Sequence, residues 1–211
     1  ALTTAEQFMR SGMSNCPLVI GADALSKVVD WKDRSCILFG DGAGAVILGE
    51  VAEENGLKLS KIFSDGEYSS VLTVQKGGER GQINDLQAKG KDPFIHMDGR
   101  AVFKLAIEKV TQTLESGLSE AGLQEEEIDF LILHQANLRI INAIKDRIKL
   151  PDERVVVNLK KYGNTSAATV PIGLSELIKT GKVQTGDTIV LLGFGAGFTW
   201  GMNILKWEAK K

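Results

Sequence analysis

The chain has few of the residues that bind metals or form cross-links: its 211 residues include two Cys, two His and four Pro. Two cysteines cannot build a disulfide framework or a four-thiolate metal site. Two histidines with no nearby cluster of Cys or Asp argue against structural zinc. We therefore expect no bound metal, and the low cysteine content favours a reducing, cytoplasmic compartment.

Excess positive charge and long apolar runs are also absent. The formal net charge is −2, so the chain lacks the basic footprint of a nucleic-acid-binding protein. Apolar runs such as residues 130–133 and 189–192 fall far short of the roughly 18 residues that would span a bilayer. We expect neither a nucleic-acid partner nor a membrane-spanning segment.

Glycine is what the chain has in excess, with 23 of 211 residues, compared with about 7% in average proteins. The apolar fraction is 43% and the charges nearly balance. This composition is typical of a packed globular core rather than of a disordered chain.

Hydrophobic periodicity predicts an α/β protein, in which helices alternate with short apolar strands that are covered on both faces. The expected helices are residues 1–12, 99–122, 137–149 and 165–180. The expected strands are residues 18–21, 36–39, 45–48, 128–133, 155–159, 188–192 and 199–207. Residues 76–91 are polar and rich in glycine, so they are expected to form an exposed excursion.

Two glycine motifs are alike: FGDGAGA at residues 39–45 and LGFGAGF at residues 192–198. Each follows an expected strand and leads into another, which indicates an internal duplication and two similar halves packed together. No helix follows either motif, and this argues against dinucleotide binding. Tight hairpins with positive φ at glycine are the simpler interpretation. For residues 193–197, an oxyanion-binding concavity of backbone N–H groups is the alternative.

His134 and Asn164 each stand between the end of an expected strand and the start of an expected helix, where open α/β folds place ligands. Each also has a structural interpretation, as a satisfied histidine or as a helix N-cap. Together, an imidazole and an amide indicate a site that donates hydrogen bonds to a developing anion. Ser166 has no orienting carboxylate in sequence, so a nucleophilic serine is disfavoured. Cys16 and Cys36 are interpreted as small buried apolar residues.

Four motifs in the chain resemble the β-ketoacyl-acyl-carrier-protein synthase III family of thiolase-fold condensing enzymes. They are HQANLRII at residues 134–141, YGNTSAA at 162–168, GDGAGA at 40–45 and FGAGFTWG at 194–201. The resemblance implies an α/β, thiolase-like fold of two duplicated layered halves. Residues 1–54 would be the remainder of the N-terminal half, incomplete in this chain, and residues 55–211 the C-terminal half.

The resemblance implies a two-stage acyl transfer that needs no cofactor. A Cys thiolate takes an acyl group from acyl-CoA. Malonyl-acyl carrier protein then loses carbon dioxide, and its carbanion condenses with the acyl-enzyme, which initiates fatty acid synthesis. His134 and Asn164 match the catalytic residues whose N–H groups stabilise the enolate. The matching active-site loop, with its oxyanion donor, consists of Phe194, Gly195 and Ala196.

The resemblance also implies binding partners: acyl-CoA, acyl carrier protein and a second copy of the chain in a homodimer. The carrier-protein-binding segment would be Gln135, Ala136, Asn137, Leu138 and Arg139. Arg139 suits an acidic carrier helix or the phosphate of phosphopantetheine. The tunnel for the pantetheine arm would be lined by Gly99, Phe103 and Asn137.

The family's nucleophilic cysteine has no counterpart in the chain. That cysteine lies at the N-terminus of a buried helix, where the helix dipole lowers the thiol pKa. The helix expected at residues 1–12 resembles the rest of that helix, so the nucleophile is expected just before Ala1. Neither Cys16 nor Cys36 matches it, and the chain alone is expected to be inactive.

Two other functions stay open from the sequence. One is a non-catalytic partner subunit of a condensing-enzyme heterodimer, which the retention of both His134 and Asn164 disfavours. The other is a condensing enzyme of the polyketide or quinolone type.

Overall fold

In the computed structural model, which describes residues 1–74 and 94–209, helices and short strands alternate along the chain as expected. The α-helices are α1 (Leu2–Arg10), α2 (Gly99–Ala121), α3 (Leu138–Arg147), α4 (Leu159–Tyr162) and α5 (Thr169–Lys179). The strands are β1 (Leu18–Ala24), β2 (Asp41–Ile47), β3 (Gly56–Ser64), β4 (Leu72–Val74), β5 (Ile95–Met97), β6 (Phe130–Leu133), β7 (Thr188–Gly195) and β8 (Thr199–Lys206). The excursion expected at residues 76–91 lies outside the described residues.

The main sheet has four strands in the order β3-β8-β7-β6. Strands β6 and β7 are parallel, whereas β7 with β8 and β8 with β3 are antiparallel. All four residues of β6 are buried, as expected for a short apolar strand that is covered on both faces. Strands β1 and β2 form a separate antiparallel pair, as do β4 and β5.

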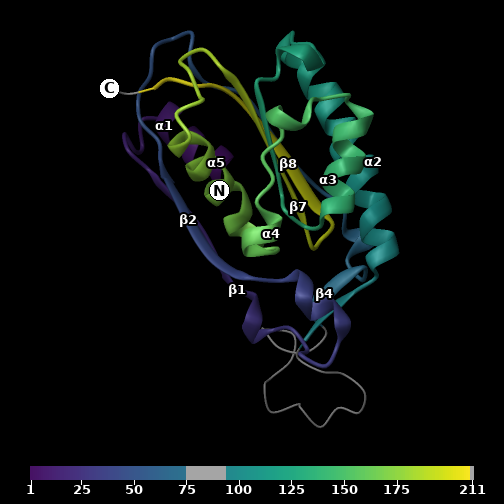
Figure 1. The fold of residues 1–211 in the computed structure, drawn as a ribbon. Coiled ribbons are helices and arrows are strands. Elements are labelled where there is room, and N and C mark those ends of the chain that lie inside the picture. Colours follow the sequence, from purple (N-terminus) through teal and green to yellow (C-terminus); the bar gives the residue numbers. More distant parts are fainter. Residues whose placement is uncertain (75–93, 210–211) are drawn as a thin grey trace.

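These elements form layers (Figure 1). Helices α2 and α3 cover one face of the main sheet, and α5 lies between its other face and the β1–β2 pair. Apolar clusters fill both faces of the main sheet, one beneath α2 and α3 and the other beneath α5. Within residues 1–74 and 94–209, no helix combines the length and the apolar surface needed to cross a membrane.

Local sequence signals set the ends of the two long helices. Helix α2 begins after Asp98, whose carboxylate accepts from two backbone N–H groups at 3.0 Å, and ends at Gly122 with φ of 69°. Helix α3 begins after Asn137, whose side chain accepts from the Ile140 N–H at 3.0 Å. These are the N-cap and left-handed C-cap interactions that the residue types favour. The expected helices 99–122 and 137–149 are therefore confirmed.

Two of the expected strands are wrong. Residues 36–39 lie mostly in a 3₁₀ helix (Arg34–Leu38). Asp33 caps the start of this helix, and its carboxylate accepts from the Ser35 N–H at 2.6 Å. Residues 155–159 contribute a single bridge, Leu131 to Val155, before α4 begins. A short apolar run becomes a strand only where a neighbouring strand supplies hydrogen bonds. The helix expected at 165–180 is also divided, into a 3₁₀ turn (Ser166–Ala168) and α5.

The two glycine motifs have different structures, so their interpretation as matching turns is wrong. Residues 192–198 do include the hairpin turn between β7 and β8, with Gly197 at φ of 140°. In the first motif Gly42 and Gly44 lie inside β2. A Cβ atom on Gly42 would lie 3.0 Å from the Thr165 side chain, and one on Gly44 2.9 Å from Pro171. These glycines let β2 pack closely against the start of α5.

Candidate active site

His134 stands just past the carboxyl end of β6. Its backbone N–H donates to the Leu192 carbonyl at 2.8 Å, so the pairing with β7 continues up to the histidine. Its ring nitrogen Nδ1 lies 2.8 Å from the hydroxyl oxygen of Thr169, the first residue of α5. The ring meets Phe194 of β7 edge-on, with 5.0 Å between ring centroids. Residues from three elements therefore fix the imidazole.

Burial determines the charge of His134. Desolvation disfavours the imidazolium form and lowers the pKa of His134 to about 4. The ring is therefore neutral at neutral pH, and only one of its two nitrogens carries a proton.

Asn164 is held by the β1–β2 side of the molecule. Its N–H donates to the Leu38 carbonyl at 2.7 Å, and its carbonyl accepts from the Gly40 N–H at 2.9 Å. Its side-chain oxygen accepts from the Ser166 N–H at 2.9 Å. The amide nitrogen Nδ2 donates to none of the described residues, which leaves its N–H groups for a ligand.

The loop that carries Asn164 packs closely against the backbone at Gly40 and Gly21. A Cβ atom on Gly40 would lie 2.1 Å from the Tyr162 carbonyl oxygen, and one on Gly21 2.3 Å from that of Ala167. The side chain of Asp23 in β1 also accepts from the Ala167 N–H at 3.0 Å. The loop that carries Asn164 therefore rests on two strands that could not approach it with larger residues.

Ser166 links the two candidate catalytic side chains. It has φ of 50°, one of two positive values among the described non-glycine residues. Its N–H is bonded to the Asn164 side chain, and its carbonyl oxygen lies 2.8 Å from the Thr169 hydroxyl that contacts His134. One short turn therefore orients both the amide and the imidazole, and strained backbone of this kind concentrates at functional sites.

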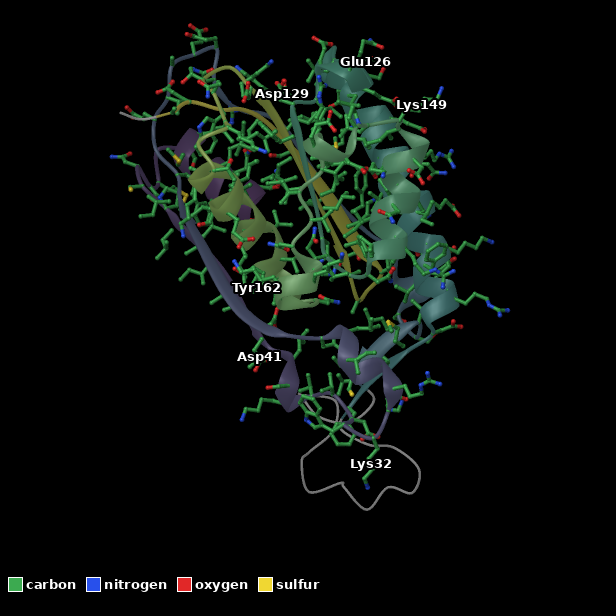
Figure 2. All side chains as sticks on the ribbon, in the orientation of Figure 1. Lys32, Asp41, Glu126, Asp129, Lys149 and Tyr162 are labelled. Atoms are coloured by element: carbon green, nitrogen blue, oxygen red, sulfur yellow. The ribbon has the colours of Figure 1, made fainter. Side chains whose placement is uncertain are left out.

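Strand direction brings these groups to one end of the molecule. Asp129, just before β6, lies at the end that also holds Glu126, whereas Tyr162 lies toward the opposite end (Figure 2). The carboxyl end of β6, with His134, therefore points toward the loop that follows Tyr162. In the part of the chain that the structure describes, no group of three or more His, Cys, Asp or Glu could hold a metal ion.

The predicted active-site loop lies at the β7–β8 hairpin. Phe194 contacts His134 and also stacks on Phe198, with 6.0 Å between centroids. Gly195 ends β7 opposite Thr199, and the Ala196 carbonyl accepts from the Thr199 hydroxyl at 2.9 Å. The hairpin thus brings Phe194 to the histidine, while Ala196 is exposed at the turn.

The segment from Gln135 to Arg139 divides into inward and outward side chains. Gln135 is buried, and its amide donates to the Leu133 and Val156 carbonyls at 2.9 and 3.1 Å. Its amide oxygen accepts from the Asn158 N–H at 3.2 Å. The surface role expected for Gln135 is replaced by a structural one, because these bonds use the whole side chain. Leu138 and Arg139 are exposed.

Phe103 and Arg139 meet between α2 and α3. The Arg139 guanidinium lies over the Phe103 ring, 5.4 Å from its centroid, at a distance typical of a cation–π contact. Phe103 also lines a groove of about 390 Å³, together with Lys104, Ile107, Glu108, Gln112 and Arg147. Gly99 is exposed at the start of α2, and Asn137 caps α3. Neither of these two lines the groove.

Neither cysteine is hydrogen-bonded to His134 or Asn164. Cys16 is exposed, which corrects its interpretation as a buried apolar residue. Cys36 is half-buried in the 3₁₀ helix, with its sulfur 4.0 Å from the Trp31 carbonyl.

Sequence reasoning missed a cluster around Glu176 of α5. The Glu176 carboxylate accepts from Asn158 Nδ2 at 3.0 Å, from Lys161 Nζ at 2.7 Å and from the Tyr162 hydroxyl at 2.7 Å. The bonds from Lys161 and Tyr162 lower the pKa of Glu176 to about 2. Sequence gives no signal for this cluster, because its partners lie 14 to 18 residues away in another helix or a loop. It ties α4 to α5 just ahead of Asn164.

Comparison with known proteins shows that the layers described above are those of a thiolase-fold protein. The family model described as 3-oxoacyl-(acyl-carrier-protein) synthase III matches residues 1–75, and the model of its C-terminal part matches residues 118–207. The chain belongs to this synthase III family, as the sequence motifs implied.

Individual relatives agree with this assignment. The chain is 46% identical over 208 residues to a β-ketoacyl-(acyl-carrier-protein) synthase III of Coxiella burnetii, covering 98% of this chain and 62% of the relative. The solved synthase III of Thermus thermophilus has a TM-score of 0.89 at 38% identity, covering 100% of this chain and 64% of that one. The priming β-ketosynthase of the R1128 polyketide pathway has a TM-score of 0.86 at 32% identity, covering 97% and 60%. The chain thus spans under two thirds of each relative's length.

Proposed function

We propose that the intact protein catalyses the decarboxylative Claisen condensation of an acyl-CoA primer with malonyl-acyl carrier protein, the step that initiates fatty acid synthesis. One observation carries the proposal. In a chain of the synthase III family, one turn at Ser166 holds both a neutral His134 and an Asn164 whose amide nitrogen is unused by the described residues.

The chemistry needs hydrogen-bond donors where negative charge develops. When the malonyl carboxylate leaves as carbon dioxide, the electron pair of the broken C–C bond passes to the thioester as an enolate. N–H groups of His134 and Asn164 would stabilise the enolate oxygen, and the loss of one such donor costs about 100- to 1,000-fold in rate. The enolate carbon then attacks the carbonyl carbon of the acyl thioester, and the resulting oxyanion would be bound by the Ala196 N–H in the loop of Phe194 and Gly195. When this intermediate collapses, the bond from the acyl carbon to sulfur breaks and the sulfur leaves as a thiolate.

The acyl-carrying thiolate in this proposal is neither Cys16 nor Cys36. Neither sulfur is joined to the histidine or the asparagine, and Cys16 is exposed. In this proposal, residues 1–211 supply the donors that stabilise the enolate and the acyl oxyanion, and they do not supply the nucleophile of the acylation half-reaction.

The groove between α2 and α3 suits the carrier protein and its pantetheine arm. Phe103 offers an apolar wall, while Lys104, Arg139 and Arg147 offer positive charge around it. An acidic protein that delivers a phosphopantetheine group matches this combination. Among the residues expected to bind the carrier protein, Leu138 and Arg139 have exposed side chains, and in this proposal these two contact it.

Three further expectations belong to the same proposal: the division into halves at residues 54 and 55, a homodimer and a cytoplasmic location. The runner-up function is priming of a polyketide, which the likeness to the R1128 priming β-ketosynthase favours. A non-catalytic subunit is disfavoured because such a subunit has no use for the linked His134 and Asn164.

The test is to replace His134 or Asn164 with Ala in the intact protein. Release of carbon dioxide from malonyl-acyl carrier protein is expected to fall about 100-fold or more, whereas acylation of the protein by acyl-CoA should change little. The chain's other histidine, His96 in β5, provides the matched control, and His96→Ala should leave decarboxylation near the wild-type rate. Loss of acylation with decarboxylation intact would contradict the assigned roles.

A further inference from the structure

Gln135, the residue directly after His134, joins the two segments that carry the candidate catalytic side chains. It is 1% exposed. Its amide nitrogen donates to the carbonyl of Leu133, at the end of β6, at 2.9 Å and to that of Val156 at 3.1 Å. Its amide oxygen accepts from the N–H of Asn158, the residue just before α4, at 3.2 Å. Because the nitrogen faces two carbonyls and the oxygen faces an N–H group, the orientation of the amide is fixed.

These bonds lie where the strand pairing stops. The segment that leads to α4 keeps one bridge to β6, between Leu131 and Val155. In a parallel ladder, one residue donates to a carbonyl and accepts from the N–H group two residues further along the neighbouring strand. The Gln135 side chain makes this pair of bonds with Val156 and Asn158. Its amide therefore takes the place of a further strand residue.

A second contact joins Asn158 to the helix that contacts the imidazole. The Asn158 amide Nδ2 donates to the carboxylate of Glu176 in α5 at 3.0 Å. Helix α5 begins with Thr169, whose hydroxyl oxygen lies 2.8 Å from Nδ1 of His134. The contacts thus form a closed series from His134 through Gln135, Asn158 and α5 back to the imidazole. Any displacement of one member is resisted by contacts on both of its sides.

Asn164 depends on this series because it follows α4. The Asn158 carbonyl accepts from the Tyr162 N–H at 3.2 Å, so α4 starts from the residue that Gln135 holds. A shift of Asn158 would move α4 and, with it, the loop of Asn164. Gln135 has no exposed polar group to offer a partner protein, since its donors and acceptor are used inside the molecule.

We infer that Gln135 is a positioning residue: by bonding Asn158 to the end of β6, it sets the separation between the imidazole of His134 and the amide of Asn164. The use of that separation in decarboxylation rests on the proposed function, whereas the anchoring of Asn158 does not.

Hydrogen exchange in the intact protein tests the anchoring by itself. Gln135→Met keeps a similar side-chain length and removes the amide, while Gln184→Met, at an exposed position between α5 and β7, is the matched control. The Asn158 amide should be protected in the wild type and in Gln184→Met. In Gln135→Met it should exchange at least about tenfold faster, and the Asn164 amide should lose protection with it.

Kinetics with malonyl-acyl carrier protein separate positioning from carrier binding. A misplacement of catalytic groups by about 1 Å can cost about 100-fold in rate. For Gln135→Met we expect the kcat of decarboxylation per folded molecule to fall about 10- to 100-fold, with KM nearly unchanged. A residue that contacts the carrier protein would raise KM instead. A merely structural role would lower only the folded fraction, which circular dichroism measures.

Two results would overturn the inference: a wild-type Asn158 amide that exchanges as fast as an exposed one, or a folded Gln135→Met protein with the wild-type kcat, whatever its KM. The exchange rate of the wild type decides the anchoring even if Gln135→Met does not fold. A protected Asn158 amide in a protein that does not decarboxylate would support the anchoring and reject only the proposed function.

Discussion

Gly40 illustrates how a single position without a side chain sets the geometry of the site. Its backbone N–H donates to the Asn164 carbonyl, and its Cα faces the Tyr162 carbonyl so closely that a Cβ atom would lie 2.1 Å away. The obstruction is backbone, which a side-chain rotation cannot relieve. The steric requirement at one glycine therefore controls where the loop with Asn164 rests.

Replacement of Gly40 by Ala should push this loop away. Overpacking of this kind typically costs about 1–3 kcal/mol of stability, and decarboxylation should fall because Asn164 moves with the loop. Urea unfolding and carbon dioxide release measure the two effects. Gly66→Ala is the matched control, because a Cβ atom there has nothing within 4 Å. Wild-type stability and activity in Gly40→Ala would show that the loop is free to shift.

His134 was identifiable at the residue scale, whereas its partner was not. A histidine between a buried strand and a helix marks the carboxyl edge of a sheet from sequence alone. Thr169 lies 35 residues further on, and no local pattern distinguishes its hydroxyl from that of another helix-starting threonine. For Gln135, the sequence indicated a residue that binds the carrier protein. Its side chain is instead buried, because it is hydrogen-bonded to backbone groups that include those of the distant residues Val156 and Asn158.

Among the elements, α4 shows how a helix of one turn is stabilised. It has four residues, too few to be stable by itself. Its Tyr162 hydroxyl and Lys161 ammonium both donate to Glu176 of α5. Lys161 is 65% exposed and Glu176 30%, so the shielded bonds from Tyr162 and Asn158 contribute more than the ion pair.

Glu176→Gln should loosen α4 and make stability depend less on pH. The folded-state pKa of Glu176 is about 2, below its ordinary value of 4.5. The stabilisation is therefore complete above 4.5 and is lost as the pH falls toward 2. At neutral pH the variant should be about 1–2 kcal/mol less stable, and the difference should shrink below pH 4.5.

Urea unfolding at several pH values measures this difference. Glu115→Gln is the matched control, because the Glu115–Arg147 pair is 3.6 Å long and both side chains are about half exposed. It should change stability little. An equal and pH-independent loss in both variants would contradict the role assigned to Glu176.

Element prediction succeeded where local signals suffice. The long helices carry both an apolar stripe and capping residues, which act within a few positions of the chain. The apolar run at residues 36–39 has no adjacent strand to pair with and forms a 3₁₀ helix instead. Strand formation depends on a partner strand that is distant in sequence. A short apolar run therefore forms a strand at residues 188–192 but not at residues 36–39.

Across the whole molecule, different layers hold the candidate catalytic residues and the groove. The β1–β2 pair supports the loop of Asn164 and α5 begins with Thr169, while β6 leads into His134 and β7 carries Phe194. Helices α2 and α3 lie on the other face of the main sheet (Figure 1). The groove along them is lined by Lys104 and Arg147 together with apolar residues and Glu108. In the proposed function, the carrier protein would therefore bind at α2 and α3, and its attached substrate would react at the end of the main sheet near His134.

Charge reversal tests this division. Arg139→Glu should raise the KM for malonyl-acyl carrier protein about tenfold, which corresponds to about 1.4 kcal/mol, and should weaken its dependence on salt. Steady-state kinetics at two ionic strengths measure both effects. Lys182→Glu, at an exposed position between α5 and β7, is the matched control. An equal effect of both variants would place carrier binding elsewhere.

The sequence by itself determined the α/β class, the main helices and the two loops that carry His134 and Asn164, because amphipathic spacing, caps and strand ends are encoded locally. Only the tertiary structure decided what those loops touch. The hydrogen bond between His134 and Thr169, the bonds that bury Gln135 and the close contacts of the β2 glycines all join residues far apart in the chain. Hydrogen-bond partners and close packing are properties of the assembled layers, which no local pattern specifies.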